Sequence, residues 1–282
     1  MEELDPMNIF EAIFLGIVQG IAEFLPISST AHIIIAEFLL GHSIPGLSFE
    51  IFLHLGSIVA VIFYFRKDII HLIQVFFRYI AKRRREDRPE FFLCLYIVLA
   101  TIITGVLGVF LEDSLGSALK TPVMIAVSLT LTGIFLIIIE RAYTIGSRTV
   151  NEMTTLDAVI VGLAQTVAVI PGISRSGSTL IAALFSGLDR ETSVRFSFLL
   201  SIPVILGSTV LALGDITDGS LASIGAVSLI AAFIASLITS WLGIVWLINF
   251  LNKGKLTYFA IYCFLLALVT ILFLDPGSTV VE

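Results

Sequence analysis

The sequence predicts an all-α polytopic membrane protein with six transmembrane helices and two re-entrant helix pairs in an inverted repeat. The first observation is composition: of 282 residues, 57% are hydrophobic and 13% are charged, and mean hydropathy is +1.06. Soluble domains carry about 25% charged residues. The second is that six apolar runs approach the ~20 residues that cross a bilayer. The third is that two further apolar regions are broken at their centres.

The six predicted spans are separated by polar loops. In chain order they are Phe49–Phe65, Phe91–Leu111, Pro122–Ile139, Val194–Leu213, Leu221–Phe250 and Leu256–Leu274. The fifth run is longer than a bilayer requires. We therefore expect it to tilt, to kink at Gly243 or to extend beyond the membrane.

The two broken regions, Met7–Gly41 and Thr154–Gly187, are apolar overall but carry proline and a serine cluster near the centre. Each half is too short to cross a bilayer comfortably. Irregular backbone at membrane depth is tolerated only where protein buries it or where it lines a cavity. Both regions therefore predict re-entrant pairs, in which two short helices enter and leave on the same side.

The distribution of charged loop residues supports this topology. Four loops are basic, and they contain Arg66, Lys67, Arg78, Lys82, Arg83, Arg84, Arg85 and Arg88, then Arg141 and Arg148, then Arg190 and Arg195, then Lys253 and Lys255. The other loops are acidic and contain Glu112, Asp113, Asp215 and Asp218. If both broken regions return to their own side, all four basic loops share the cytoplasmic face and only Lys120 lies on the wrong side. Both termini are then predicted to be extracytoplasmic, in a plasma-membrane protein.

The first basic loop has a second feature. In the stretch "KDIIHLIQVFFRYIAKRRRE" (Lys67–Glu86), apolar and polar residues recur at the spacing of an amphipathic helix, and the stretch ends in a basic cluster. This pattern is typical of a helix that lies in the membrane interface. We therefore expect an amphipathic interfacial helix with its basic end in the cytoplasm.

The two broken regions also repeat each other in sequence. "EAIFLGIVQGIAEFLPISST" (Glu11–Thr30) aligns with "DAVIVGLAQTVAVIPGISRS" (Asp157–Ser176) when one residue is inserted beside the proline. An internal repeat in a membrane protein indicates two structural halves. We place repeat one at about 7–140 and repeat two at about 154–274, within a single membrane domain. Because the predicted topology inverts them, the two broken tips should meet near the midplane.

Polar residues gather at the first tip. Gln19 and Glu23 lie four residues apart and so share a helix face, and Ser29 and His32 lie three apart on the next helix. An intramembrane carboxylate is costly, and its default interpretation is functional. We therefore expect these four side chains to form one part of a site.

The second tip carries Ser174, Arg175, Ser176 and Thr179 directly after Pro171 and Gly172. Ser174 is positioned as an N-cap, and the N–H groups at the start of a helix bind anions, phosphate above all. Arg175 adds a charge-assisted fork to that cradle. A carboxylate, a Ser–His pair and an anion cradle at one locus together favour phosphoryl chemistry.

Several polar residues have a structural alternative. Ser28, Thr30, Ser176 and Ser178 are equally well read as hydrogen-bonding groups between helices, and Gln165 can bridge helices in the same way. His42, His54 and His71 are taken to satisfy local partners. Cys94 and Cys263 lie in apolar runs and are taken as small hydrophobes. The net charge of −6 does not indicate binding to nucleic acid.

At these residues the chain closely resembles the bacitracin-resistance family of undecaprenyl-diphosphate phosphatases, over almost its whole length. "QGIAEFLPISSTAH" resembles the family's first motif, "PGISRSGST" its second, and "HLGSIVAV" the segment after the first. The functional positions of the family fall here on Gln19, Glu23, Ser29, His32, Ser174, Arg175 and Thr179. This chain departs from the pattern at Gln19, often Glu, and at Ala31, often Gly. The Gln19 departure removes a charged metal ligand.

The resemblance implies an enzyme that hydrolyses a polyprenyl diphosphate to the monophosphate and phosphate, and so recycles the lipid carrier of cell-wall synthesis. Ser29 is the expected nucleophile with His32 as general base, although a water activated by His32 is an open alternative. Glu23, helped by Gln19, is expected to hold a divalent cation, Mg²⁺ or Ca²⁺. Arg175 with the phosphate-binding group Ser174, Ser176 and Thr179 is expected to clamp phosphate.

The expected partners are the lipid substrate and membrane lipid, with no nucleic acid. The site is expected to open to the extracytoplasmic face. A homodimer is one option that the sequence leaves open. The rival interpretation is a polyprenyl-phosphate flippase without hydrolytic activity, because inverted repeats with broken helices are also a transporter design. A flippase needs the arginine but has no need of a nucleophile and a base.

Overall fold

The computed structural model describes residues 7–40, 48–115, 121–142, 146–211, 221, 224–253 and 255–274. Within these ranges the regular secondary structure is helical, apart from one isolated β-bridge between Arg148 and Leu188. The side chains of Glu112, Asp113, Lys253 and His42, the residues Lys120, Asp215 and Asp218, and the acidic ends of the chain lie outside the described part. The all-α prediction is confirmed.

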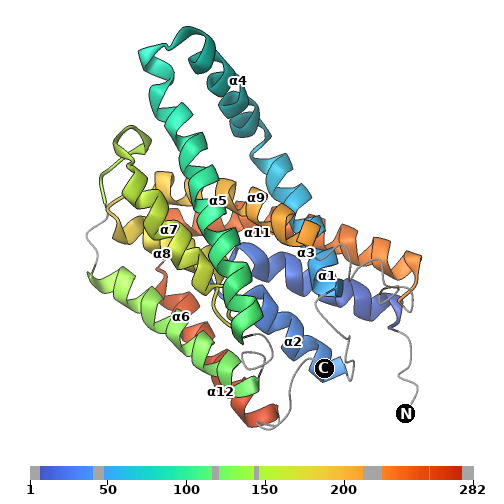
Figure 1. Ribbon diagram of the computed structural model, residues 1–282. Helices are drawn as coiled ribbons and strands as arrows, with labels where there is room; N and C mark the ends of the chain where they lie inside the picture. Colours follow the sequence, from blue (N-terminus) through green and yellow to red (C-terminus); the bar gives the residue numbers. More distant parts are fainter. Residues whose placement is uncertain are drawn as a thin grey trace.

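The helices are arranged around two packed hairpins (Figure 1). They are α1 (Ile9–Phe24), α2 (Ser29–Leu40), α3 (Ser48–Tyr64), α4 (Arg66–Lys82), α5 (Arg88–Leu115), α6 (Pro122–Ala142), α7 (Thr155–Val167), α8 (Arg175–Phe185), α9 (Arg190–Leu211), α11 (Ala226–Lys253) and α12 (Thr257–Phe273), with 3₁₀ turns η1 (Arg85–Asp87) and η3 (Val150–Glu152). The hairpins are α1 with α2 and α7 with α8, and the helices of each pair pack on one another.

This is a polytopic membrane protein, although the predicted count of six spans is not confirmed. Among the described residues, four helices are long and apolar enough to cross a membrane, namely Arg85–Leu111, Pro122–Arg141, Arg190–Leu211 and Ala226–Leu251. The predicted first span is α3, which is short and bends by 70° into α4. The predicted sixth span is α12, which has 17 residues. α11 runs through Gly243 without a break.

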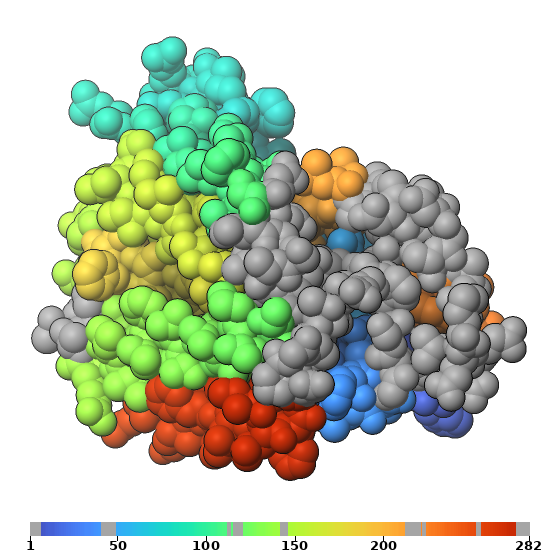
Figure 2. Space-filling model, turned by 60° about the horizontal axis from the view of Figure 1, so that its bottom comes forward, coloured from blue at the N-terminus to red at the C-terminus, as the bar shows by residue number. Residues whose placement is uncertain are grey.

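The outer surface is apolar, as lipid requires. On α12, Leu265, Leu268 and Leu272 are each more than half exposed, at 58%, 53% and 65%. Figure 2 shows α12 along the edge of the molecule beside α6. Because soluble proteins rarely expose apolar patches of this extent, the surface indicates contact with a membrane.

The two hairpins begin in the same way and break for recognisable reasons. α1 starts with a capping box of Asn8 and Glu11, and α7 starts with one of Thr154 and Asp157. The first break contains Pro26, which has no N–H, and Ser28, whose φ is +68°. The second contains Pro171 and Gly172, whose φ is +94°. These local signals explain why each apolar region forms two short helices.

The two broken tips touch, as the sequence predicts. The hydroxyls of Ser174 and Ser176 donate to the carbonyl of Leu25 at 3.4 and 3.0 Å. Directly behind the contact, the Phe198 ring of α9 lies 5.3 Å from Phe24 and 5.5 Å from Phe65 between ring centroids. The largest buried apolar cluster therefore supports the junction of the tips.

α1 is held in place by close packing on α11. At Gly16 and Gly20 a Cβ atom would come closer than 3.0 Å to the backbone of Ala232 and of Ser236 respectively. Small residues spaced four apart on both helices allow the backbones to approach, as is common between membrane helices. This packing fixes the helix that carries Gln19 and Glu23.

α4 forms an amphipathic helix as predicted, with Leu72 and Val75 buried and Ile73 and Phe77 exposed. Its position in a membrane interface stays a prediction. On α9, Arg195 binds both Asp68 of α4 and Glu90 of α5, with the Glu90 contact bidentate at 2.9 and 3.0 Å. This network joins the three helices beside the first basic loop.

Candidate active site

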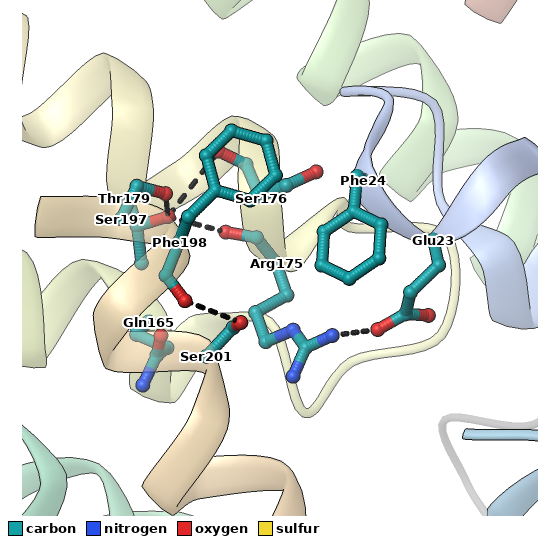
Figure 3. Close-up of a pocket in the computed structure, with 9 residues that line it drawn as sticks. All are labelled: Glu23, Phe24, Gln165, Arg175, Ser176, Thr179, Ser197, Phe198 and Ser201. Atoms are coloured by element: carbon teal, nitrogen blue, oxygen red, sulfur yellow. Dashed lines mark hydrogen bonds and ion pairs between the residues drawn. The ribbon is translucent and has the colours of Figure 1, made fainter. Parts of the chain in front are cut away.

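The junction of the tips is organised around the buried carboxylate of Glu23, in the last turn of α1. Its Oε2 accepts hydrogen bonds from Gln19 Nε2 and from Ser29 Oγ, each at 2.8 Å. Its Oε1 forms an ion pair with Arg175 (Figure 3). Gln19 reaches the carboxylate because it lies one turn earlier on α1, and Ser29 does so as the first residue of α2. Three of the four predicted first-tip residues therefore meet at one carboxylate.

Arg175 is the first residue of α8 and crosses from the second tip to the first. Ser174 precedes it as the predicted N-cap, and its Oγ accepts from the Gly177 N–H at 3.1 Å. Arg175 is largely buried, with 19% of its side chain exposed. A buried charge persists only when it is paired. The sequence could not identify its partner, and the structure assigns that place to Glu23.

His32 does not pair with Ser29, because the Ser29 hydroxyl donates to Glu23 instead. A carboxylate is a stronger acceptor than a neutral imidazole. His32 Nδ1 lies 2.6 Å from the Ser28 carbonyl oxygen, and Nε2 lies 2.7 Å from the Tyr262 hydroxyl. Ser29 and His32, which were predicted to pair, therefore have different partners: Ser29 contacts Glu23, and His32 contacts Ser28 and Tyr262. Tyr262 of α12 had no sequence signal, since 230 residues separate it from His32.

His54 of α3 is a second residue that the sequence did not bring to the site. Its Nδ1 lies 2.7 Å from the Glu50 carbonyl oxygen, which is the local partner that we expected. Its Nε2 lies 3.2 Å from Glu23 Oε2. The sequence places His54 in the segment "HLGSIVAV", but the spacing of residues in that segment does not predict a contact with α1.

The remaining predicted phosphate-binding hydroxyls lie beside Arg175. Ser176 and Ser174 lie 3.2 Å apart between their Oγ atoms, in addition to their bonds to Leu25. The Thr179 hydroxyl contacts the Arg175 carbonyl at 3.1 Å and the Ser197 hydroxyl of α9. The hydroxyls of Ser174 and Ser176 therefore hold the tips together, which is the structural alternative for Ser176, whereas the Thr179 hydroxyl joins α8 to α9. Beside Arg175, a small cavity extends between α1, α8 and α9 (Figure 3).

The side chains around Glu23 fit a divalent cation held with few protein ligands. Gln19 Oε1 is buried and has no hydrogen-bond partner. Within the described ranges, no three His, Cys, Asp or Glu side chains are grouped for a metal. Mg²⁺ is commonly bound by one or two carboxylates and completed by substrate phosphates. Glu23 with Gln19 matches that pattern. Gln165, at the equivalent place in the second hairpin, instead donates to Thr104 of α5 at 3.0 Å and so bridges helices.

An apolar hollow lies beside the first tip, between α1 and α11. It is lined by Ile21, Leu25, Thr239, Leu242, Gly243 and Trp246. Leu25 belongs both to this hollow and to the junction, because its carbonyl accepts the Ser174 and Ser176 hydroxyls. The polar junction and an apolar surface are therefore adjacent.

Comparisons with known proteins match nearly the whole chain to one family. The sequence model of the family described as "Bacitracin resistance protein BacA" matches residues 12–269. "Undecaprenyl-diphosphatase 2" of Halalkalibacterium halodurans is 58% identical, over 97% of this chain and 99% of the relative. "Undecaprenyl-diphosphatase 1" of Shouchella clausii is 53% identical, over 95% and 98%. "Undecaprenyl-diphosphatase 3" of Bacillus anthracis is 41% identical, over 94% and 98%.

Proposed function

Because this chain belongs to the bacitracin resistance protein BacA family, we propose that it hydrolyses undecaprenyl diphosphate to undecaprenyl phosphate and inorganic phosphate. It is an integral membrane phosphatase, and its relatives carry the name of that activity. The product is a lipid carrier that cell-wall and glycan synthesis can use again. The same activity accounts for the bacitracin resistance in the family's description.

The observation that carries this proposal is the junction at Glu23. One buried carboxylate contacts a hydroxyl nucleophile, Ser29, and an arginine, Arg175, from opposite tips. Such a junction provides a proton acceptor and a phosphate ligand within one polar centre. A lipid diphosphate brings the negative charge that Arg175 and the start of α8 are suited to bind.

Ser29 is the proposed nucleophile. Its Oγ attacks the terminal phosphorus, the bond from that phosphorus to the bridging oxygen breaks, and undecaprenyl phosphate leaves. Glu23 accepts the Ser29 proton, because it is the acceptor that this hydroxyl contacts at 2.8 Å. Water then hydrolyses the phosphoserine with His32 as general base. Direct attack by a water that His32 activates is the competing route.

Arg175 is the proposed clamp on the transferred phosphoryl group. The N–H groups at the start of α8, together with the hydroxyls of Ser174, Ser176 and Thr179, add hydrogen-bond donors around it. These groups stabilise the charge that develops on the phosphoryl oxygens. Because Arg175 is paired with Glu23 before the substrate arrives, the phosphate exchanges one anionic partner of the arginine for another.

A divalent cation, Mg²⁺ or Ca²⁺, is the proposed cofactor. Glu23 and Gln19 would hold it, because a carboxylate and an unpaired amide oxygen are the ligands that hard cations prefer. When bound, it would neutralise charge on the phosphate oxygens. The chain's own residues carry out the other steps: Arg175 binds the phosphate, and Glu23 accepts the proton of Ser29.

The hollow beside Leu25 is the proposed place of the prenyl chain next to the diphosphate. Its lining is apolar, and it adjoins the Leu25 carbonyl that binds the second tip. In a membrane this surface faces lipid, so a prenyl chain can remain among lipid chains while its headgroup reaches Arg175. This arrangement would allow one substrate to contact both an ion pair and hydrocarbon.

The proposed orientation follows the basic loops. The two hairpins belong to inverted repeats of about 7–140 and 154–274, both termini are extracytoplasmic, and the site opens to the extracytoplasmic face. The matching capping boxes of α1 and α7 support the repeat. A homodimer is compatible with this arrangement.

The test is phosphate release from undecaprenyl diphosphate by the purified protein in detergent, with Mg²⁺ and with chelator. We expect metal-dependent release by the wild type and a loss of about 10²- to 10³-fold in Arg175→Ala, the range for removal of one transition-state donor. Arg84→Ala is the control, since Arg84 lies on the exposed side of the basic loop. Ser29→Ala should abolish release if Ser29 is the nucleophile and should retain much of it if water attacks directly. No release by folded wild type would favour the flippase.

A further inference from the structure

The two nitrogens of the His54 ring face two oxygen atoms. Nδ1 lies 2.7 Å from the backbone carbonyl oxygen of Glu50, and Nε2 lies 3.2 Å from Oε2 of Glu23. A carbonyl oxygen can only accept a hydrogen bond, so Nδ1 carries a proton and donates it. In the neutral imidazole this fixes the tautomer, and the lone pair of Nε2 then points towards the Glu23 carboxylate.

The Nε2 lone pair and the Glu23 carboxylate oxygen, 3.2 Å apart, repel each other unless a proton on Nε2 or a bound cation lies between them. A backbone carbonyl that holds Nδ1–H is the support commonly found behind a histidine that binds a metal. Ligand atoms around one small cation are themselves about 3 Å apart, because each lies about 2.0–2.2 Å from the ion. The separation of His54 Nε2 and Glu23 Oε2 is therefore suited to a shared cation.

Gln19 is an independent observation at the same place. Its side chain is completely buried, its Nε2 donates to Glu23 Oε2, and its Oε1 has no donor. A buried amide oxygen without a partner costs about 1–3 kcal/mol. A cation next to Glu23 would supply the missing partner. Two separate features, an orphan oxygen and a nitrogen aimed at a carboxylate, thus point to one ligand.

We propose that His54 is a metal ligand in this chain, and that Glu23, Gln19 and His54 together form a mixed oxygen and nitrogen site. The inference rests on the proposed function for the identity of the completing ligand, which is the substrate phosphate. An imidazole ligand favours transition-metal divalent cations over Mg²⁺ and Ca²⁺, and Mn²⁺ accepts carboxylate oxygen equally well. The oxygen ligands suit Mg²⁺, Ca²⁺ and Mn²⁺ alike, and His54 would raise the affinity of the site for Mn²⁺ relative to Mg²⁺.

The test uses Mn²⁺ itself as the probe, with substrate absent. Electron spin echo envelope modulation of Mn²⁺ bound to the purified wild type should show a directly coordinated ¹⁴N nucleus. His54→Gln should lose that ¹⁴N signal, and its affinity for Mn²⁺ relative to Mg²⁺ should fall at least tenfold in a competition titration. His71→Gln on exposed α4 is the matched control and should keep both properties. Thermal unfolding of each variant in detergent establishes that it is folded.

Three results would overturn the inference. They are no binding of Mn²⁺ to the wild type, bound Mn²⁺ without a ¹⁴N signal, or a signal that persists in His54→Gln and disappears in His32→Gln. The binding measurement needs no turnover, so it separates this inference from the proposed function. A wild type that binds Mn²⁺ through His54 but releases no phosphate would leave the metal site standing and refute the phosphatase.

Discussion

The Tyr262 hydroxyl lies 2.7 Å from Nε2 of His32, and the two rings stack with centroids 5.5 Å apart and planes within 3° of parallel. His32 Nδ1 faces the Ser28 carbonyl oxygen, so Nδ1 carries the proton and Nε2 accepts from the tyrosine. Tyr262 therefore fixes both the plane of the imidazole and its lone pair. It ties α12, near the end of the chain, to the first tip.

We predict that Tyr262→Phe lowers kcat/KM for phosphate release about two- to tenfold, because one hydrogen bond of about 0.5–1.5 kcal/mol is removed while the stacking remains. Tyr262→Leu, which also removes the stacked ring, should have a larger effect. Tyr258→Phe, an exposed tyrosine on the same helix, serves as the control. A faster enzyme in Tyr262→Phe would mean that the hydroxyl competes for the His32 lone pair and does not position it.

Close packing of α1 on α11 gives the second prediction. Gly16→Ala and Gly20→Ala should each lower stability by about 1–3 kcal/mol, the usual range for overpacking. The reason is that the new methyl group meets backbone atoms of α11, which cannot rotate away. Thermal unfolding in detergent measures the effect. Gly207→Ala on α9 is the matched control, since its Cβ would have no neighbour within 4 Å. Equal stability of Gly20→Ala and Gly207→Ala would contradict the helix contact.

The Arg195 network gives the third prediction. Arg195→Gln removes charge-assisted hydrogen bonds to Asp68 and Glu90 and should cost about 1.5–3 kcal/mol, because Arg195 is mostly buried between α4, α5 and α9. Arg84→Gln removes the exposed Arg84–Glu86 pair, and such pairs contribute about 0–1 kcal/mol. A thermal shift that is no larger for Arg195→Gln than for Arg84→Gln would show that the network does not hold α4.

Local features of the fold could be predicted because short-range chemistry determines them. Pro26 and Pro171 mark the two breaks in apolar sequence, and Ser174 precedes α8 as an N-cap. The contact between the tips followed from the repeat and from the charge of the loops. The count of spans did not, because the sequence cannot show that the chain bends by 70° between α3 and α4.

The candidate site could be predicted only as a set of residues, and not as a set of contacts. Glu23 and Arg175 were expected at opposite tips, but their direct pairing depends on how α1 and α8 are rotated. His54 and Tyr262 belong to α3 and α12, whose packing against the tips comes from tertiary contacts. Ser29 was expected to meet His32, and the stronger acceptor Glu23 holds its hydroxyl instead.

The last prediction concerns the hollow beside Leu25. A Cβ at Gly243 would have ordinary contacts, with the Gly20 carbonyl oxygen at 3.4 Å and Leu25 Cδ1 at 3.8 Å, so the helix tolerates a side chain there. Gly243→Leu should fill the hollow and raise KM for undecaprenyl diphosphate at least tenfold. The diphosphate ester of a two-carbon alcohol should be affected much less, because it has no prenyl chain to place in the hollow.

The comparison of the two substrates is what makes this test specific. A general disturbance of α1 would weaken hydrolysis of both, because Glu23 lies on the same helix, whereas loss of a prenyl surface affects only the long chain. Gly207→Leu, on the exposed side of α9, should change neither KM. If Gly243→Leu hydrolyses undecaprenyl diphosphate with an unchanged KM, the prenyl chain leaves the junction along another face of the protein.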